Sequence, residues 1–168
     1  MVYFIFYLTE KNLVFNTRKL EIEFFKSQFE VLNADHNDLA GNPFSLHSGT
    51  YRIEILNGDP SVDAAFDAPV YFGQTNATVK PDRLTSATVT ATLANVMASV
   101  SLDETIAEHF VSTSVTVSNA SGASLTFSSD EDNYDKTGYF KVDGGLSWSV
   151  DFVTPEGIHY YNSASYSD

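Results

Sequence analysis

The sequence predicts an all-β protein, built as an antiparallel β-sandwich with one short helix. Two observations lead to this prediction. Apolar and polar residues alternate in many short segments, and clusters of turn-forming Asn, Asp, Gly and Pro separate these segments. Alternation with a period of two is typical of half-buried strands, and many short strands in series are typical of a sandwich or barrel.

The clearest alternation in the first half of the chain begins at Tyr51. Ile53 and Ile55 continue its apolar face, and the charged residues Arg52 and Glu54 lie between them. Similar patterns recur at short spacing toward the C-terminus. The predicted strands cover residues 51–56, 76–80, 87–93, 96–102, 111–118, 124–128, 139–142 and 146–153, and weaker strand patterns cover 2–8, 20–32 and 160–161.

One segment, residues 103–109, has a helical pattern instead. Ser101 or Asp103 can cap a helix, and acidic residues suit its first turn. Ile106 and Phe110 lie four residues apart, which places both on one helical face. We therefore predict a short helix at 103–109 that bridges two strands and covers one end of the sandwich.

The strongest core strand is predicted at residues 146–153, where four apolar residues alternate with serines and an aspartate. We expect Trp148 to be buried in this strand. The Asp-Gly-Gly sequence at 143–145 is typical of a hairpin turn leading into it. The predicted core face consists of Leu146, Trp148, Val150 and Phe152.

Length and composition predict one domain. The chain has 168 residues, of which 43% are hydrophobic, and this is enough for a packed core. We predict a single β-sandwich domain over residues 20–168 and an N-terminal extension over residues 1–19. The apolar run 2–8 is either a strand or translated sequence ahead of the domain. It is shorter than a membrane span and lacks the flanking residues of an export signal.

The charge and the absence of cysteine exclude several classes of function. A net charge of −13 repels nucleic acid and disfavours docking on anionic lipid. With no cysteine, the chain has no disulfide, thiolate metal site or cysteine nucleophile, and it has no lipid-bearing cysteine either. We therefore expect no nucleic-acid partner and no transmembrane span in this chain.

Acidic residues are dense at 130–135, where carboxylate and amide oxygens would suit Ca²⁺. The spacing does not match a helix–loop–helix calcium site, because Asp135 stands where that pattern requires glycine. The turn-forming segment 33–38 does not match either. The four histidines show no metal-binding spacing, and no nucleophile elbow or phosphate-binding loop is present. We predict no metal site, no cofactor and no catalytic residue, so the protein is not expected to be an enzyme. A looser calcium site built by the loop at 130–135 stays an alternative.

Exposed aromatic residues are the remaining candidates for binding. Tyr160 and Tyr161 are adjacent, so in a strand only one of them can face the core. The other could stack on a glycan or contact a peptide. The candidate binding residues are Tyr160, Tyr161, Asp130, Asp132 and Asp135.

Four short motifs follow one another along the chain, with a short predicted helix at 104–110 that ends near an aromatic residue. The motifs are Gly-Thr-Tyr at 49–51, Phe-Asp-Ala-Pro-Val-Tyr-Phe-Gly at 66–73, Leu-Ala-Asn at 93–95 and Gly-Tyr-Phe at 138–140. Together they resemble a family of exported domains from Bacteroidetes that is grouped with fimbrillin-like and major-fimbrium-like surface proteins, and the resemblance covers roughly residues 29–161.

The resemblance implies a transthyretin-like or immunoglobulin-like Greek-key sandwich at the cell surface or outer membrane. It implies no catalysis. Gly49 and Gly73 are expected to permit tight turns, and Tyr51 and Tyr71 are expected to pack in the core. The family's export signal and lipid-bearing cysteine are absent from this sequence, and residues 1–19 have no counterpart in the pattern.

The leading functional prediction is therefore a non-enzymatic structural or adhesive module, such as a fimbrillin-like subunit or a domain of a surface lipoprotein. Other surface or fimbrial subunits would join it by adding a strand to an open sheet edge, with the run 2–8 as a possible donor. The alternative is a glycan- or peptide-binding module that uses exposed tyrosines and the acidic segment 130–135 to hold host or glycan ligands.

Overall fold

The computed structural model describes residues 4–8, 20–26, 29–35, 45–103 and 105–167. The chain forms two compact units and passes from one to the other after Gly58, Pro69 and Leu93. Unit 1 contains residues 1–58 and 70–93, and unit 2 contains residues 59–69 and 94–168. A single domain over residues 20–168 stays a prediction, because compactness does not establish whether the units unfold together. No helix among the described residues is long and apolar enough to cross a membrane.

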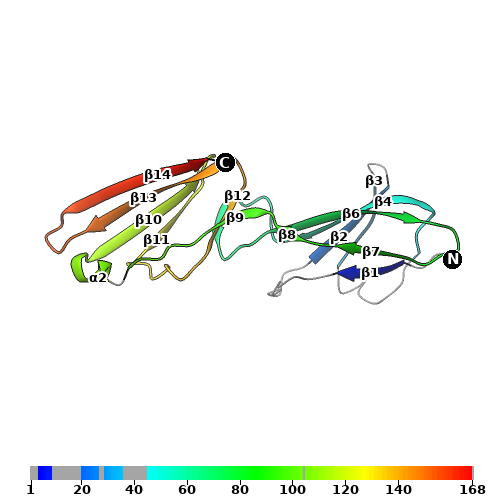
Figure 1. Ribbon diagram of the computed structural model, residues 1–168, viewed down its shortest axis with the longest axis horizontal. Helices are drawn as coiled ribbons and strands as arrows, with labels where there is room; N and C mark the ends of the chain where they lie inside the picture. The colour runs from blue at the N-terminus through cyan, green and yellow to red at the C-terminus, as the bar shows by residue number, and fades with distance from the viewer. Residues whose placement is uncertain (1–3, 9–19, 27–28, 36–44, 104, 168) are drawn as a thin grey trace. The chain divides into compact units, whose positions relative to one another are not determined.

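Unit 1 combines a five-stranded sheet, in the order β3-β2-β4-β6-β8, with the two-stranded sheet β1-β7 (Figure 1). The five-stranded sheet is antiparallel throughout, whereas β1 and β7 run parallel. The strands are β1 (Phe4–Leu8), β2 (Leu20–Lys26), β3 (Phe29–Asp35), β4 (Gly49–Asn57), β6 (Tyr71–Val79), β7 (Thr85–Val89) and β8 (Thr92–Leu93).

The alternation that begins at Tyr51 buries one face of β4, as predicted. Tyr51, Ile53 and Ile55 are almost completely buried. Burial also raises the pKa of the Tyr51 hydroxyl. Tyr71 is only half-buried. Gly73 is not in a turn, contrary to expectation: it lies inside β6, where a Cβ atom would lie 2.4 Å from the backbone oxygen of Thr90.

The N-terminal strand β1 pairs in parallel with β7 of the same chain, from Phe4 opposite Thr85 to Leu8 opposite Val89. The predicted strand at 2–8 is therefore present from Phe4 onward, but here its partner belongs to its own unit. Residues 9–19, which complete the predicted extension, lie outside the described part of the chain.

Unit 2 is a sandwich of the four-stranded sheet β11-β10-β13-β14 and the three-stranded sheet β5-β12-β9, and both sheets are antiparallel. These sheets, with those of unit 1, confirm the predicted all-β class. The elements of unit 2 are β5 (Ala64–Phe66), β9 (Asn95–Ala98), α2 (Ile106–His109), β10 (Ser112–Asn119), β11 (Ser124–Ser128), β12 (Gly138–Lys141), β13 (Gly145–Val153) and β14 (His159–Ser167).

The predicted helix is present as α2 but starts later than expected, at Ile106. Asp103 lies ahead of it and accepts hydrogen bonds from the backbone N–H and the hydroxyl of Thr105, at 3.0 and 2.6 Å. These bonds, led by the one from the Thr105 hydroxyl, hold the pKa of Asp103 below its ordinary value. Phe110 has an extended backbone and ends the helix.

The core of unit 2 lies between its two sheets. Phe127 and Phe140 are both 0% exposed and occupy its centre. Leu146 and Phe152 pack against them, as the alternation in β13 predicted. Trp148 also packs there but is only half-buried, which corrects the prediction of a buried Trp148. Its neighbour on β14 is Ala164, whose exposed methyl group is too small to cover the indole ring. The central buried residues are Val115, Val117, Phe127, Phe140 and Val150.

Residues 143–145 do not form a hairpin turn, contrary to prediction, because β12 and β13 belong to different sheets. Asp143 instead accepts hydrogen bonds from the backbone N–H groups of Ala120 (3.0 Å) and Ser121 (2.7 Å) in the β10–β11 turn. Desolvation by itself raises the pKa of Asp143. The hydrogen bonds from Ser121 and Ala120 and the charge of Lys141 outweigh it, and the pKa lies below its ordinary value.

Candidate functional site

Strand β14 forms a long open edge of unit 2. It is the outermost strand of the four-stranded sheet, and no described strand pairs with its far side (Figure 1, red). Its nine residues, HYYNSASYS, include no Asp, Glu, Lys, Arg or Pro. Edge strands normally carry charges, prolines or bulges that prevent pairing with another chain. Strand β14 therefore has the length and composition of a strand that can accept a partner.

The other sheet edges in the described part of the chain are shorter or charged. Strands β1, β7 and β11 have five residues each, and β9, β5 and β8 have four, three and two. Strand β3 has seven residues, but its sequence contains Glu30 and Asp35. Because a short strand offers few backbone groups and a charged one resists pairing, β14 is the edge best suited to strand addition.

The direction of the backbone groups of β14 follows from two hydrogen bonds. Val111 donates its N–H to the carbonyl of Val153 at 2.8 Å, so Val153 directs its backbone groups toward β10. Its neighbour Phe152 must then direct its groups toward β14, where it lies opposite Tyr160. Even-numbered residues of β14 therefore bond to β13, and odd-numbered ones face the open edge. Ser163 agrees, because it donates its N–H to the side-chain oxygen of Asn162 at 2.8 Å.

The inner side of β14, which continues the core face of β13, is uncovered. Tyr160 and Tyr166 lie opposite Phe152 and Leu146, yet they are 54% and 67% exposed. Phe110 contacts Tyr160, with ring centroids 6.1 Å apart. One of the two adjacent tyrosines does lie on the core side, as expected, but it is not buried. Two exposed tyrosines, one near each end of the strand, are thus available to a partner.

The outer side of β14 carries a polar cluster. Tyr161 is 74% exposed and stacks on His159, with ring centroids 5.7 Å apart and planes 11° apart. The Nδ1 atom of His159 lies 2.9 Å from a carboxylate oxygen of Asp151 and 3.2 Å from the Tyr161 hydroxyl. Water reaches this cluster, so it provides a polar and aromatic contact surface.

The acidic candidates lie in the loop that follows β11, at the opposite edge of the same sheet. Asp130, Asp132 and Asp135 are exposed. Asp130 accepts a hydrogen bond from the hydroxyl of Ser112 at 3.0 Å. Because β10 and β13 separate this loop from β14, the structure does not bring the acids and tyrosines together as one site. Among the described residues, no cluster of three or more histidines or acids could hold a metal ion.

The acidic loop is shaped by the buried side chain of Asn133. Its oxygen accepts the N–H of Ser128 at 2.7 Å, and its nitrogen donates to the carbonyl of Thr126 at 3.0 Å and to Glu131 at 3.2 Å. The side chain thus satisfies two backbone groups of β11. The acidic residues around it follow the shape that Asn133 gives the loop.

Replacing Asn133 by alanine is expected to lower the free energy of unfolding of unit 2 by about 1–3 kcal/mol, because two backbone groups lose their partners. Urea denaturation followed by Trp148 fluorescence would measure this change. Asp135→Ala is the matched control in the same loop, since Asp135 is exposed. If the two variants had the same urea midpoint, the hydrogen bonds from Asn133 to the β11 backbone would not stabilise unit 2.

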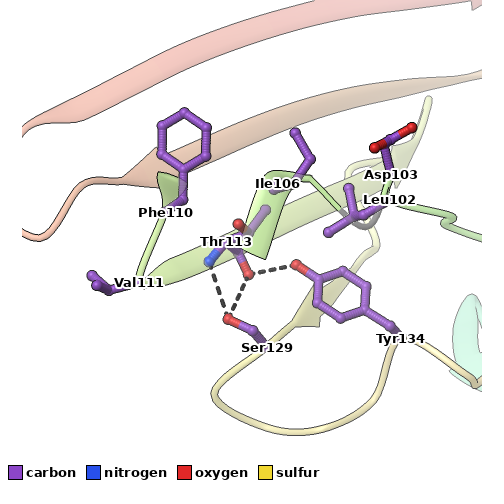
Figure 2. Close-up of a pocket in the computed structure, with 8 residues that line it drawn as sticks. All are labelled: Leu102, Asp103, Ile106, Phe110, Val111, Thr113, Ser129 and Tyr134. Atoms are coloured by element: carbon purple, nitrogen blue, oxygen red, sulfur yellow. Dashed lines mark hydrogen bonds between the residues drawn. The ribbon is translucent and has the colours of Figure 1, made fainter. Parts of the chain in front are cut away.

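Unit 2 also contains an open pocket of about 570 Å³ next to α2 (Figure 2). Its lining is largely apolar, with polar groups on one side. That volume falls in the range of small-molecule sites. The lining residues are Leu102, Asp103, Ile106, Phe110, Val111, Thr113, Ser129 and Tyr134.

The polar groups of this pocket bond largely to one another (Figure 2). Tyr134 donates its hydroxyl to the carbonyl of Thr113, and Thr113 donates its N–H to the hydroxyl of Ser129 at 3.1 Å. Burial raises the pKa of the Tyr134 hydroxyl. These groups therefore stabilise the junction of β10 and the acidic loop, and the remaining apolar wall could accept an apolar group.

Sequence reasoning found part of these surfaces. It identified Tyr160 and Tyr161, and the spacing of Ile106 and Phe110 located the helix beside the pocket. It missed Tyr166, because the serine-rich end of β14 has no apolar alternation. It also missed the pocket, since the wall combines residues from two stretches of the chain, 102–113 and 129–134, that only the fold brings together. A pattern within one segment does not show which other segment lies beside it in the fold.

Three comparisons relate the chain to known proteins. The model of a domain of unknown function (DUF4493) matches residues 9–156, so β14 follows the matched region. A crystal structure of a candidate adhesin from Bacteroides ovatus has a TM-score of 0.50, and the alignment covers 98% of this chain and 81% of that one. The two sequences are 8% identical, so this likeness concerns the fold alone. No curated protein matches the chain.

Proposed function

We propose that this chain, which belongs to the DUF4493 family of domains of unknown function, is a non-enzymatic structural or adhesive module of a cell surface. A partner protein joins it by adding a strand to the open edge of β14. The observation that carries the proposal is the length and lack of charge of this edge strand. A fold shared with a candidate adhesin supports the surface location.

Strand addition uses the backbone groups that β14 directs outward. Tyr161, Ser163 and Ser165 present their N–H and carbonyl groups to the open edge, because the even-numbered residues between them bond to β13. In this mode, main-chain hydrogen bonds supply affinity, and side chains on alternate positions supply selectivity. A fimbrillin-like subunit and a domain of an outer-membrane surface lipoprotein would both use such an edge to connect to the next protein.

The role of the edge can be tested by replacing Ser163 with proline. Proline removes an N–H that faces the open edge and leaves the hydrogen bonds between β13 and β14 intact. Beads coated with purified protein would be incubated with native cells, and the retained beads counted. We expect Ser163→Pro to reduce retention about tenfold, since strand pairing across Ser163 is blocked.

Two control variants accompany this experiment. Ser163→Ala keeps the backbone N–H and should be retained like the unchanged protein. Ala164→Pro removes an N–H that faces β13 and should weaken the fold itself, which Trp148 fluorescence would reveal. Unchanged retention of a folded Ser163→Pro variant would rule out strand addition at β14.

The proposed location can be tested separately on native cells. Protease added to intact cells should remove the protein if it lies on the surface, while a cytosolic marker stays intact. Protection of the protein until the cells are lysed would contradict a surface location.

A second candidate function is glycan or peptide binding by the outer side of β14. The specific observation in its favour is the exposed stack of Tyr161 on His159, because flat aromatic surfaces of this kind pack against sugar rings. The acidic loop takes no part, since it lies at the opposite edge of the sheet. Glycan-array binding that is lost in Tyr161→Ala and kept in Ser163→Pro would favour this candidate.

A further inference from the structure

We propose that the strand that pairs with β14 is β14 of a second copy of the chain, related to the first by a two-fold axis through Ser163. This inference rests on the proposed strand addition and names its partner. It makes the connection isologous, so that the same nine residues contribute from both sides. The two four-stranded sheets would then form one continuous sheet.

The register of this pairing follows from the strand itself. A two-fold axis between the edges makes the two strands antiparallel, and among antiparallel registers only the one centred on Ser163 pairs all nine residues of β14 with all nine residues of its copy. It places Ser163 opposite Ser163 and Tyr161 opposite Ser165. All of these residues direct their backbone groups toward the open edge. Each opposing pair can therefore exchange two hydrogen bonds, as antiparallel ladders require.

The same register matches the side chains on the inner side. Tyr160 of each copy lies opposite Tyr166 of the other, so two aromatic pairs form symmetrically about the axis. Both side chains are more than half exposed in the single chain. Directly opposed residues on one face of an antiparallel pair have Cβ atoms about 4.5–5.5 Å apart, which is contact distance for two rings. The pairing would thus cover the two exposed tyrosines of each copy.

The charge distribution favours an uncharged partner strand. The chain carries a net charge of −13, so two copies repel each other over most orientations. Strand β14 contains no Asp, Glu, Lys or Arg, and a charged partner strand would find no opposite charge along this edge. A second β14 offers hydrogen-bond partners to the backbone groups at this edge and places no like charges opposite each other.

Asn162 controls access to the centre of this contact. Its side-chain oxygen accepts the N–H of Ser163 at 2.8 Å, and Ser163 is the residue on the proposed axis. Pairing must replace this bond by one to the second copy. Asn162→Val removes the competing acceptor, because valine has no polar side-chain atom, and it introduces a good strand former. The variant should therefore associate more tightly than the unchanged chain.

A cysteine-free chain allows a direct test by disulfide formation. In a hydrogen-bonded antiparallel pair the Cα atoms are about 5.5 Å apart, which suits a disulfide. Ser163→Cys should therefore give mostly disulfide-linked dimers under mild oxidation. Ser165→Cys alone should not, because its partner is Tyr161. Ser147→Cys, exposed on β13 and away from the edge, is the matched control.

Analytical ultracentrifugation measures the same association without cysteine. The unchanged chain should form dimers, Ser163→Pro should be monomeric, and Asn162→Val should lower the dimer dissociation constant severalfold. Two results together would overturn the second copy as partner. The unchanged chain would be monomeric, and Ser163→Cys would form no more disulfide-linked dimer than Ser147→Cys. If beads coated with Ser163→Pro were still retained less than beads coated with the unchanged chain, the proposed strand addition at β14 would hold with a different partner. If retention were unchanged as well, both proposals would fail.

Discussion

Phe127→Ala is expected to lower the free energy of unfolding of unit 2 by about 3–5 kcal/mol. Phe127 is completely buried, and its ring meets Phe66 edge to face, with centroids 5.1 Å apart and planes at 87°. Phe66 belongs to one sheet and Phe127 to the other, so truncation opens a cavity between the two layers. Urea denaturation followed by Trp148 fluorescence would measure the change, because the chain's one tryptophan belongs to unit 2.

Two variants serve as controls for Phe127→Ala. Val142→Ala removes a side chain that is largely exposed and should change stability by no more than about 0.5 kcal/mol. Trp148→Ala, followed by circular dichroism, should cost less than Phe127→Ala because the indole is only half-buried. If Trp148→Ala lost more free energy of unfolding than Phe127→Ala, the core would not be centred on Phe127.

Gly73→Ala should lower the stability of unit 1 by about 2–3 kcal/mol. A Cβ atom at Gly73 would meet the Thr90 oxygen at 2.4 Å, the Thr90 carbonyl carbon at 2.9 Å and the Ala91 Cα at 3.0 Å. All three are backbone atoms, so β6 and the segment before β8 must move apart. Circular dichroism during urea denaturation would record the loss.

Gly138→Ala is the matched control for this steric effect. Its added methyl group would meet side-chain atoms of Leu125, Phe127 and Phe140 at 3.1–3.2 Å, and such atoms can shift by a few tenths of an ångström. We expect a smaller loss than for Gly73→Ala. If both variants lost the same free energy of unfolding, the close approach of the Thr90 backbone would not be the reason that residue 73 must be glycine.

The Gly73 variant also tests the domain organisation. Gly73 lies in unit 1 and Trp148 in unit 2. If the chain unfolds as the single domain predicted over residues 20–168, both the circular dichroism and the Trp148 signals should shift together. If only circular dichroism shifts, the two units unfold separately.

Local chemistry explains which elements could be predicted from the sequence. Tyr51, Ile53 and Ile55 alternate with polar residues, and this pattern already determines which face of β4 is buried. The alternation in β13 determined its core face in the same way. Ile106 and the acids before it predicted a helix, although α2 begins three residues later than expected. Strand β5, with only three residues, was missed because its pairing with β12 depends on residues far away in the sequence.

The candidate site shows where such reasoning ends. The sequence by itself determined an acidic all-β chain without cysteine, and it determined that Tyr160 and Tyr161 lie on opposite sides of one strand. Only the tertiary structure decided that β14 is an open edge, that Trp148 is partly exposed beside Ala164, and that residues 143–145 connect two sheets. The physical reason is that a side chain's alternation is a property of its own strand, whereas burial and edge position depend on which strands lie beside it.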